Sequence, residues 1–128
     1  MYQVYADIQN AGIQRIPLTG PSLALPVDDI VTAWQPSSKL VFVTTPNNPT
    51  GHSLDIDDIV ALIRALDGRG IVVIDAAYIE FGSPAAIMAL RSCSNVIILR
   101  TLSKAYGLAG ARCGSLIADP VIIGLIEK

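Results

Sequence analysis

Charged residues are scarce in this chain, and positive charge is concentrated nowhere along it. Charged side chains make up 16% of the 128 residues, the formal net charge is −2, and lysines and arginines form no run. A nucleic-acid-binding surface needs a basic patch or stripe, so the composition argues against one. Hydrophobic residues nevertheless make up 52% of the chain, which is enough to bury a core and argues against disorder.

Histidine and cysteine are nearly absent. His52 is the only histidine, which rules out a metal site built from several histidines within this chain. It lies in a Gly-His-Ser segment, where a solvated loop position is the plainest interpretation. Cys93 and Cys113 are the only cysteines and show no Cys-x-x-Cys spacing. Isolated cysteines of this kind are more often small buried residues than parts of a disulfide or a metal site.

Long apolar segments are missing as well. No stretch reaches the roughly 20 apolar residues that cross a bilayer as a helix. Residues 1–7 have neither the basic nor the apolar region of a secretory signal peptide, so we expect a cytoplasmic protein. The chain also lacks the Gly-x-Gly-x-x-Gly and Walker-type loops of nucleotide-binding α/β domains, and this alternative therefore finds no support in the sequence.

The segments that are present alternate between strand-like and helix-like patterns. Apolar runs, or apolar–polar alternation, predict strands at residues 13–18, 40–44, 71–74, 96–99 and 115–118. Helical spacing, caps and proline stops predict helices at residues 1–9, 27–34, 55–66, 84–91 and 121–127. This alternation is typical of an α/β, three-layer α-β-α fold, in which helices cover both faces of a mostly parallel sheet.

Polar residues follow three of the predicted strands at the point where each strand ends. Asn48 follows the first of these strands, Asp75 ends the second, and Thr101, Ser103 and Lys104 follow the third. Strands joined through helices are expected to pair in parallel, and ligands bind at the carboxyl ends of such strands. We therefore expect these side chains to converge on one site.

The chemistry of these residues points to one kind of ligand. Asp75 ends an apolar strand, and a desolvated carboxylate needs a cationic partner such as a protonated pyridine nitrogen. Lys104 beside a buried site can lose its proton and form a Schiff base. Hydroxyl groups near an arginine suit a phosphate, and here these are Thr101, Ser103 and Arg112. Pyridoxal phosphate combines a ring nitrogen, an aldehyde and a phosphate.

Three motifs at these strand ends resemble those of fold-type-I pyridoxal-phosphate enzymes, the aspartate-aminotransferase superfamily. Residues 46–51 read Pro-Asn-Asn-Pro-Thr-Gly, residues 75–81 read Asp-Ala-Ala-Tyr-Ile-Glu-Phe, and residues 100–114 read Arg-Thr-Leu-Ser-Lys-Ala-Tyr-Gly-Leu-Ala-Gly-Ala-Arg-Cys-Gly. Within the superfamily, the chain is most similar to the histidinol-phosphate aminotransferases. Any one motif alone is a weak signal, whereas three in the family's order, each at a strand end, make a strong one.

The resemblance implies a role for each polar residue. Lys104 would hold pyridoxal 5'-phosphate as a Schiff base and carry a proton during turnover, and Asp75 would keep the pyridine nitrogen protonated. The phenolic oxygen of the ring would accept hydrogen bonds from Asn48 and Tyr78. The phosphate would be held by Thr101, Ser103 and Arg112.

The resemblance also implies the setting of these residues. Residues 1–128 would form the central part of the cofactor-binding large domain, without the small C-terminal domain. The protein would be a homodimer that transfers an amino group from a small-molecule donor, histidinol phosphate, to a 2-oxo acid, 2-oxoglutarate, in histidine biosynthesis. Because the last predicted helix stops with the chain, we interpret the sequence as an excerpt, and we expect it to be inactive alone.

One residue departs from the family pattern, and two further functions share the motifs. Ala76 stands where the family usually has glutamate. Another fold-type-I enzyme, such as a threonine-phosphate decarboxylase, would carry the same three motifs. A non-catalytic sensor domain of the aminotransferase type would carry them too, but would accompany a DNA-binding domain, for which this chain offers no sign.

Overall fold

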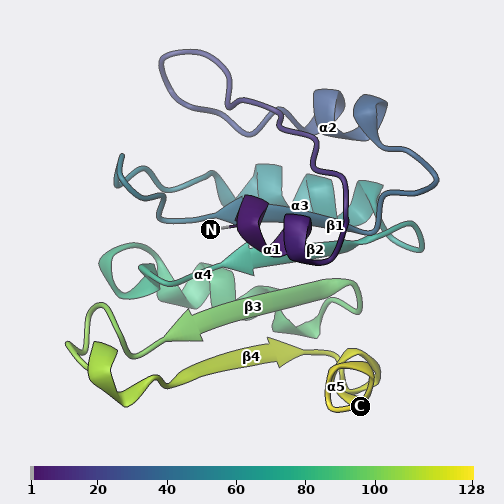
Figure 1. Cartoon of the computed structure of the whole chain (residues 1–128). Helices are drawn as coiled ribbons and strands as arrows, with labels where there is room; N and C mark the ends of the chain where they lie inside the picture. The colour runs from purple at the N-terminus through teal and green to yellow at the C-terminus, as the bar shows by residue number, and fades with distance from the viewer. Residues whose placement is uncertain (1) are drawn as a thin grey trace.

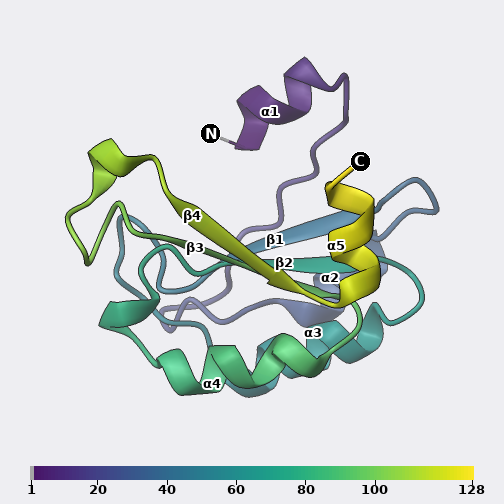
Figure 2. The same cartoon turned by 90° about the horizontal axis from the view of Figure 1, so that it is seen from below.

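The computed structural model, which describes residues 2–128, consists of one four-stranded sheet with helices on both of its faces (Figures 1 and 2). The strands lie in the order β1-β2-β3-β4 and comprise Leu40–Thr44, Ile71–Asp75, Val96–Thr101 and Gly114–Ala118. The first three strands pair in parallel, and β4 pairs antiparallel to β3. The predicted mostly parallel α/β sheet is confirmed.

The helices are divided unequally between the two faces of the sheet. They are α1 (Tyr2–Ile8), α2 (Val27–Ala33), α3 (Ile56–Ala65), α4 (Pro84–Ala89) and α5 (Pro120–Ile126), with 3₁₀ turns η1 (Ile79–Phe81), η2 (Leu90–Ser92) and η3 (Ala109–Ala111). Figure 2 shows α2, α3 and α4 below the sheet and α1 and α5 above it. Within residues 2–128, no helix is long and apolar enough to cross a membrane.

Local sequence explains where the longest helix, α3, begins and which face it buries. The Asp55 side chain accepts a 2.9 Å hydrogen bond from the Asp57 backbone N–H and so caps the helix. Ile59, Leu62 and Ile63 recur at helical spacing and are buried against the sheet. The α5 helix begins in the same way, because Asp119 caps it and Pro120 occupies its first turn.

The core has one large part and one small part. The large part lies between the sheet and α2, α3 and α4, and includes Val72, Ile74 and Ile98, which are fully buried. On the opposite face, Ile122 of α5 packs against Val73 and Ile97. Both faces of β2 and β3 are therefore buried, as is typical of parallel strands, and the carboxyl ends of these strands carry Asp75 and Thr101.

The predicted strand at residues 13–18 is wrong. The chain is irregular there, and the nearest pairing is a single antiparallel bridge between Thr19 and Ala24. Pro17 cannot donate a ladder hydrogen bond, and Ile16 and Leu18 instead pack against the main core from an irregular segment. Met1, in the predicted helix at residues 1–9, lies outside the described residues, and the helix predicted at 84–91 passes into the 3₁₀ turn η2.

Candidate active site

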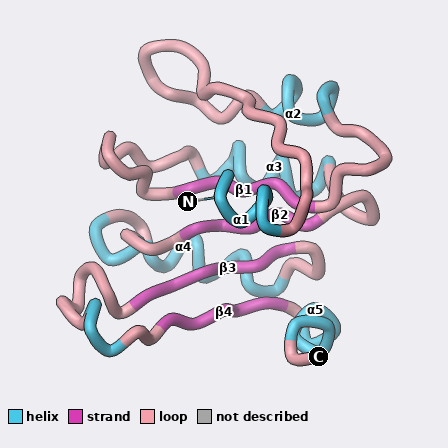
Figure 3. Tube along the Cα trace, in the orientation of Figure 1, coloured by secondary structure: helices cyan, strands magenta, loops and turns pink. Residues whose placement is uncertain are grey.

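Three loops leave the carboxyl ends of β1, β2 and β3 along one edge of the sheet. Figure 3 shows these loops at the left of the molecule. The first loop carries Asn48, the second carries Tyr78, and the third carries Ser103 and Lys104. Because these strands are parallel and in register, residues distant in sequence come to one edge, as the fold predicts.

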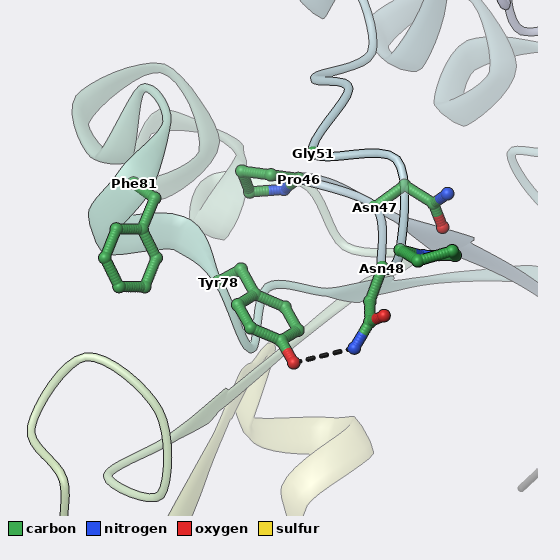
Figure 4. Close-up of a pocket in the computed structure, with 7 residues that line it drawn as sticks. Pro46, Asn47, Asn48, Gly51, Tyr78 and Phe81 are labelled. Atoms are coloured by element: carbon green, nitrogen blue, oxygen red, sulfur yellow. Dashed lines mark hydrogen bonds between the residues drawn. The ribbon is translucent and has the colours of Figure 1, made fainter.

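Tyr78 links two of these loops. Its hydroxyl accepts a 2.7 Å hydrogen bond from the side-chain amide of Asn48, and Figure 4 shows the two groups directed at each other across an open pocket. The Lys104 ammonium lies 5.3 Å from the centroid of the Tyr78 ring, close enough for a cation–π contact. The pocket is lined by Pro46, Asn47, Asn48, Pro49, Gly51, Tyr78 and Phe81.

The loop that presents Asn48 is held by its own hydrogen bonds. The Asn47 side chain donates to the Thr50 hydroxyl over 2.9 Å, and the Gly51 N–H donates to the Asn47 carbonyl over 2.7 Å. Gly51 has a φ of 69°, a left-handed conformation that glycine adopts without strain. At the loop base, the buried Thr45 hydroxyl accepts the Leu54 N–H over 3.0 Å. Asn48 therefore projects from a closed, braced turn.

Asp75 is a half-buried carboxylate at the end of β2. One oxygen, Oδ1, accepts the Ala77 backbone N–H over 3.1 Å, and the other, Oδ2, accepts the Tyr2 hydroxyl. Within residues 2–128, Asp75 makes no ion pair. A half-buried carboxylate with hydrogen bonds but no ion-pair partner fits a positively charged ligand group.

The loop after β3 groups two of the predicted phosphate-binding residues. The Thr101 hydroxyl donates to the Ser103 hydroxyl over 2.9 Å and accepts the Ser103 N–H over 3.1 Å. Arg112 lies nine residues after Ser103, on an exposed turn with a left-handed φ of 48°, and its guanidinium donates to the Ala109 carbonyl over 3.2 Å. The loop closes through a 3.1 Å bond from the Leu102 N–H to the Cys113 carbonyl.

The structure thus joins some of the predicted site residues and leaves others apart. Asn48, Tyr78 and Lys104 are in contact, and Thr101 contacts Ser103. Within residues 2–128, the side chains of Asp75 and Arg112 form no hydrogen bond or ion pair with the other predicted site residues. No cluster of three histidine, cysteine or acidic residues that could hold a metal ion occurs in the same residues.

Two interactions at this edge carry no signature in the sequence. The Arg100 guanidinium forms a 2.5 Å ion pair with Glu80, which ties the end of β3 to the turn η1. Burial alone raises the pKa of Glu80, but the hydrogen bond and charge of Arg100 outweigh burial and lower it. The second interaction is the hydrogen bond from Tyr2 to Asp75. Both join residues at least 20 positions apart, so no local pattern marks them.

The sequence of this chain is similar to those of known proteins. The family described as "Aminotransferase class I and II" matches residues 1–128, the whole chain. The chain belongs to the class I and II aminotransferases. Histidinol-phosphate aminotransferases from Xanthomonas campestris and Legionella pneumophila are 42% and 39% identical to it, over 100% of the chain. The chain spans 36% of the length of each of these relatives.

Solved aminotransferase structures share the fold. The histidinol-phosphate aminotransferase from Sinorhizobium meliloti, a complex with pyridoxal-5'-phosphate, superposes with a TM-score of 0.80 at 27% identity, over 98% of this chain and 35% of that one. N-succinyldiaminopimelate aminotransferase from Mycobacterium tuberculosis reaches 0.79 at 18% identity, over 96% and 34%. At that identity the second comparison shows the fold alone, because the fold is shared by enzymes with different substrates.

Proposed function

We propose that this chain binds pyridoxal 5'-phosphate and forms the cofactor site of a transaminase. The observation that carries the proposal is the gathering of Asn48, Tyr78 and Lys104 at the carboxyl edge of a parallel sheet that also ends in Asp75. The amine, phenol and amide are in contact, and the same sheet edge carries a carboxylate without an ion-pair partner. These groups match the aldehyde, the phenolic oxygen and the ring nitrogen of this cofactor.

Each residue has a proposed task at the site. Lys104 binds the cofactor aldehyde covalently and, once released, holds and moves the substrate proton. Asp75 pairs with the protonated ring nitrogen. The cofactor, when bound, supplies an electron sink for the bond that breaks at the substrate carbon. The phenolic oxygen is held by Asn48 and Tyr78, and the phosphate by Thr101, Ser103 and Arg112.

Arg112 needs to move for this assignment to hold. Its guanidinium contacts the Ala109 carbonyl of its own turn rather than the Thr101 and Ser103 hydroxyls. The side chain is exposed, and rotamers of exposed side chains exchange within nanoseconds. We propose that the phosphate dianion draws it inward, because a guanidinium binds phosphate through two parallel hydrogen bonds.

The proposed amino donor is histidinol phosphate and the proposed acceptor is 2-oxoglutarate. Support comes from the 42% and 39% identity to proteins named histidinol-phosphate aminotransferase.

We further propose that residues 1–128 are the central part of a cofactor-binding large domain, and that the intact protein is a homodimer. Val121 and Leu125 of α5 are exposed apolar side chains, a surface that a further element of the intact protein would cover. The cytoplasmic location expected from the sequence stays a prediction.

A titration with pyridoxal phosphate tests the proposal. The purified intact protein should develop a visible absorbance band that borohydride fixes covalently, and Lys104→Ala should abolish the band. Lys39→Ala is the matched control, because Lys39 is exposed and contacts only the Pro36 carbonyl. With the intact protein, amino transfer to 2-oxoglutarate should proceed from histidinol phosphate and hardly at all from histidinol, which lacks the phosphate. An intact protein that shows no band after addition of pyridoxal phosphate would rule out the cofactor assignment.

A further inference from the structure

Tyr2, at the start of α1, contacts a residue of the proposed site that is distant in sequence. It begins α1, which lies on the sheet face opposite α2, α3 and α4 (Figure 2). Its ring packs on Phe42 of β1, with centroids 4.7 Å apart and planes inclined at 35°. Its hydroxyl donates a hydrogen bond to Oδ2 of Asp75, 73 residues away. The fold thus brings the Tyr2 hydroxyl into contact with Asp75, the carboxylate that is proposed to pair with the pyridine nitrogen.

The position of this hydroxyl is set by two neighbouring strands. Thr44 and Asp75 are register partners, as the last residues of β1 and β2. The Tyr2 hydroxyl interacts with the side chains of both. Burial, the hydrogen bond to Asp75 and the negative charge of Asp75 raise the pKa of Tyr2, and they outweigh the Thr44 hydrogen bond, which lowers it. Tyr2 therefore remains a proton donor at neutral and moderately alkaline pH.

Two donors orient the Asp75 carboxylate from different directions. Ala77, from the following turn, donates to Oδ1, and Tyr2, from α1, donates to Oδ2. Each carboxylate oxygen can accept two hydrogen bonds, so each keeps a free acceptor position. A carboxylate held at both oxygens cannot rotate freely, and a ligand that pairs with it loses less entropy in ordering it.

We propose that Tyr2 is a positioning residue that holds the Asp75 carboxylate toward the protonated ring nitrogen of the cofactor. The inference rests on the proposed function, because it assigns Tyr2 a task at the same site. Tyr2 does not touch the cofactor in this account. It acts only through Asp75, so its contribution should depend on the ring nitrogen with which Asp75 pairs.

Tyr2→Phe isolates the hydroxyl, because phenylalanine keeps the ring that packs on Phe42. Tyr5→Phe is the matched control: it removes a hydroxyl from the same helix, where the Tyr5 side chain is 61% exposed. Binding of pyridoxal phosphate is compared with binding of its analogue that has carbon in place of the ring nitrogen. Tyr2→Phe should weaken binding of pyridoxal phosphate about five- to thirty-fold, and binding of the analogue by less than about two-fold. Tyr5→Phe should change neither.

The outcomes separate this inference from the proposed function. An equal loss for both ligands, or no loss for either, would overturn the role of Tyr2 while leaving the cofactor assignment intact. Wild-type protein that binds neither ligand would overturn both. If Tyr2→Phe does not fold, 3-fluorotyrosine at position 2 keeps the hydroxyl and reports by ¹⁹F NMR. Its signal should then shift with pyridoxal phosphate and much less with the analogue, and equal shifts would contradict the inference.

Discussion

The side-chain amide of Asn48 donates a 2.7 Å hydrogen bond to the hydroxyl of Tyr78, across 30 residues of sequence. The bond joins the braced turn after β1 to the segment after β2, and the Lys104 ammonium lies over the same Tyr78 ring. A phenol that accepts from an amide still has its own proton to donate. Tyr78 can therefore bind a ligand oxygen while Asn48 holds it in place.

Removing the Tyr78 hydroxyl should weaken cofactor binding without disturbing the fold. We expect Tyr78→Phe to raise the Kd for pyridoxal phosphate about three- to ten-fold, since one hydrogen bond to the ligand is lost. Thermal unfolding without cofactor should change by less than about 1 kcal/mol, because the bond is exposed. Spectroscopic titration and calorimetry measure the two quantities, and Tyr5→Phe serves as control. An unchanged Kd would remove Tyr78 from the proposed site.

Gly82 should tolerate no side chain, because a Cβ there would lie 2.8 Å from Cγ of Pro46 and 3.2 Å from Oγ of Ser53. In Gly82→Ala, the added methyl group must displace Pro46 and with it the turn that carries Asn48. We expect a loss of about 1–3 kcal/mol in the free energy of unfolding and weaker cofactor binding. Gly12→Ala is the matched control, because nothing lies within 4 Å of a Cβ at that position. Equal stability of the two variants in urea unfolding would contradict this packing.

The Glu80–Arg100 ion pair should make stability depend on pH on the acid side. The pKa of Glu80 is lowered in the folded protein, so its contribution is present above the ordinary glutamate pKa of about 4.3 and is lost as the pH falls through the lowered value. At pH near 7, Glu80→Gln should cost about 1–2 kcal/mol, because the pair is partly exposed. The difference from wild type should shrink toward pH near 3.

Urea unfolding at several pH values measures this difference. Glu127→Gln, at the exposed end of α5, is the matched control. A gap between Glu80→Gln and wild type that stayed constant from neutral to acid pH would show that the charge of Glu80 contributes nothing to stability.

The Tyr2 hydroxyl should make the stability of the folded protein decrease as the pH rises into the alkaline range. Its pKa is raised in the folded protein, so its contribution is fully present below the ordinary tyrosine value of about 10 and declines as the pH rises above it. Wild-type protein should therefore lose stability more steeply than Tyr2→Phe between about pH 9 and pH 11. Chemical unfolding across this range checks the slope. Parallel curves for the two proteins would mean that the Tyr2 hydroxyl is not held by Asp75.

Much of the site could be predicted because its residues follow strong strand signals. The apolar runs before Thr44, Asp75 and Thr101 are short, β-branched and separated by helical segments, so both the strands and their parallel order follow. The turn at residues 46–51 follows from its prolines, asparagines and glycine. Position at a strand end then brings Asn48, Asp75 and Lys104 to one edge.

The remaining features depend on three-dimensional contacts that no local pattern encodes. Residues 13–18 have the alternation of a strand, but Ile16 and Leu18 reach the core without joining the sheet. The Tyr2–Asp75 bond needs α1 to be placed over the sheet, which its seven residues alone do not specify. Arg112 lies in the third motif, yet its orientation depends on the left-handed turn in which it lies.

Identification of the lysine that borohydride fixes to the cofactor is the most direct test of the account. The chain has three lysines, Lys39, Lys104 and Lys128, so peptide mapping by mass spectrometry after reduction of the loaded protein separates the possibilities. The account predicts a phosphopyridoxyl adduct on Lys104 and almost none on the other two. An adduct spread over all three lysines, or confined to Lys39 or Lys128, would contradict it.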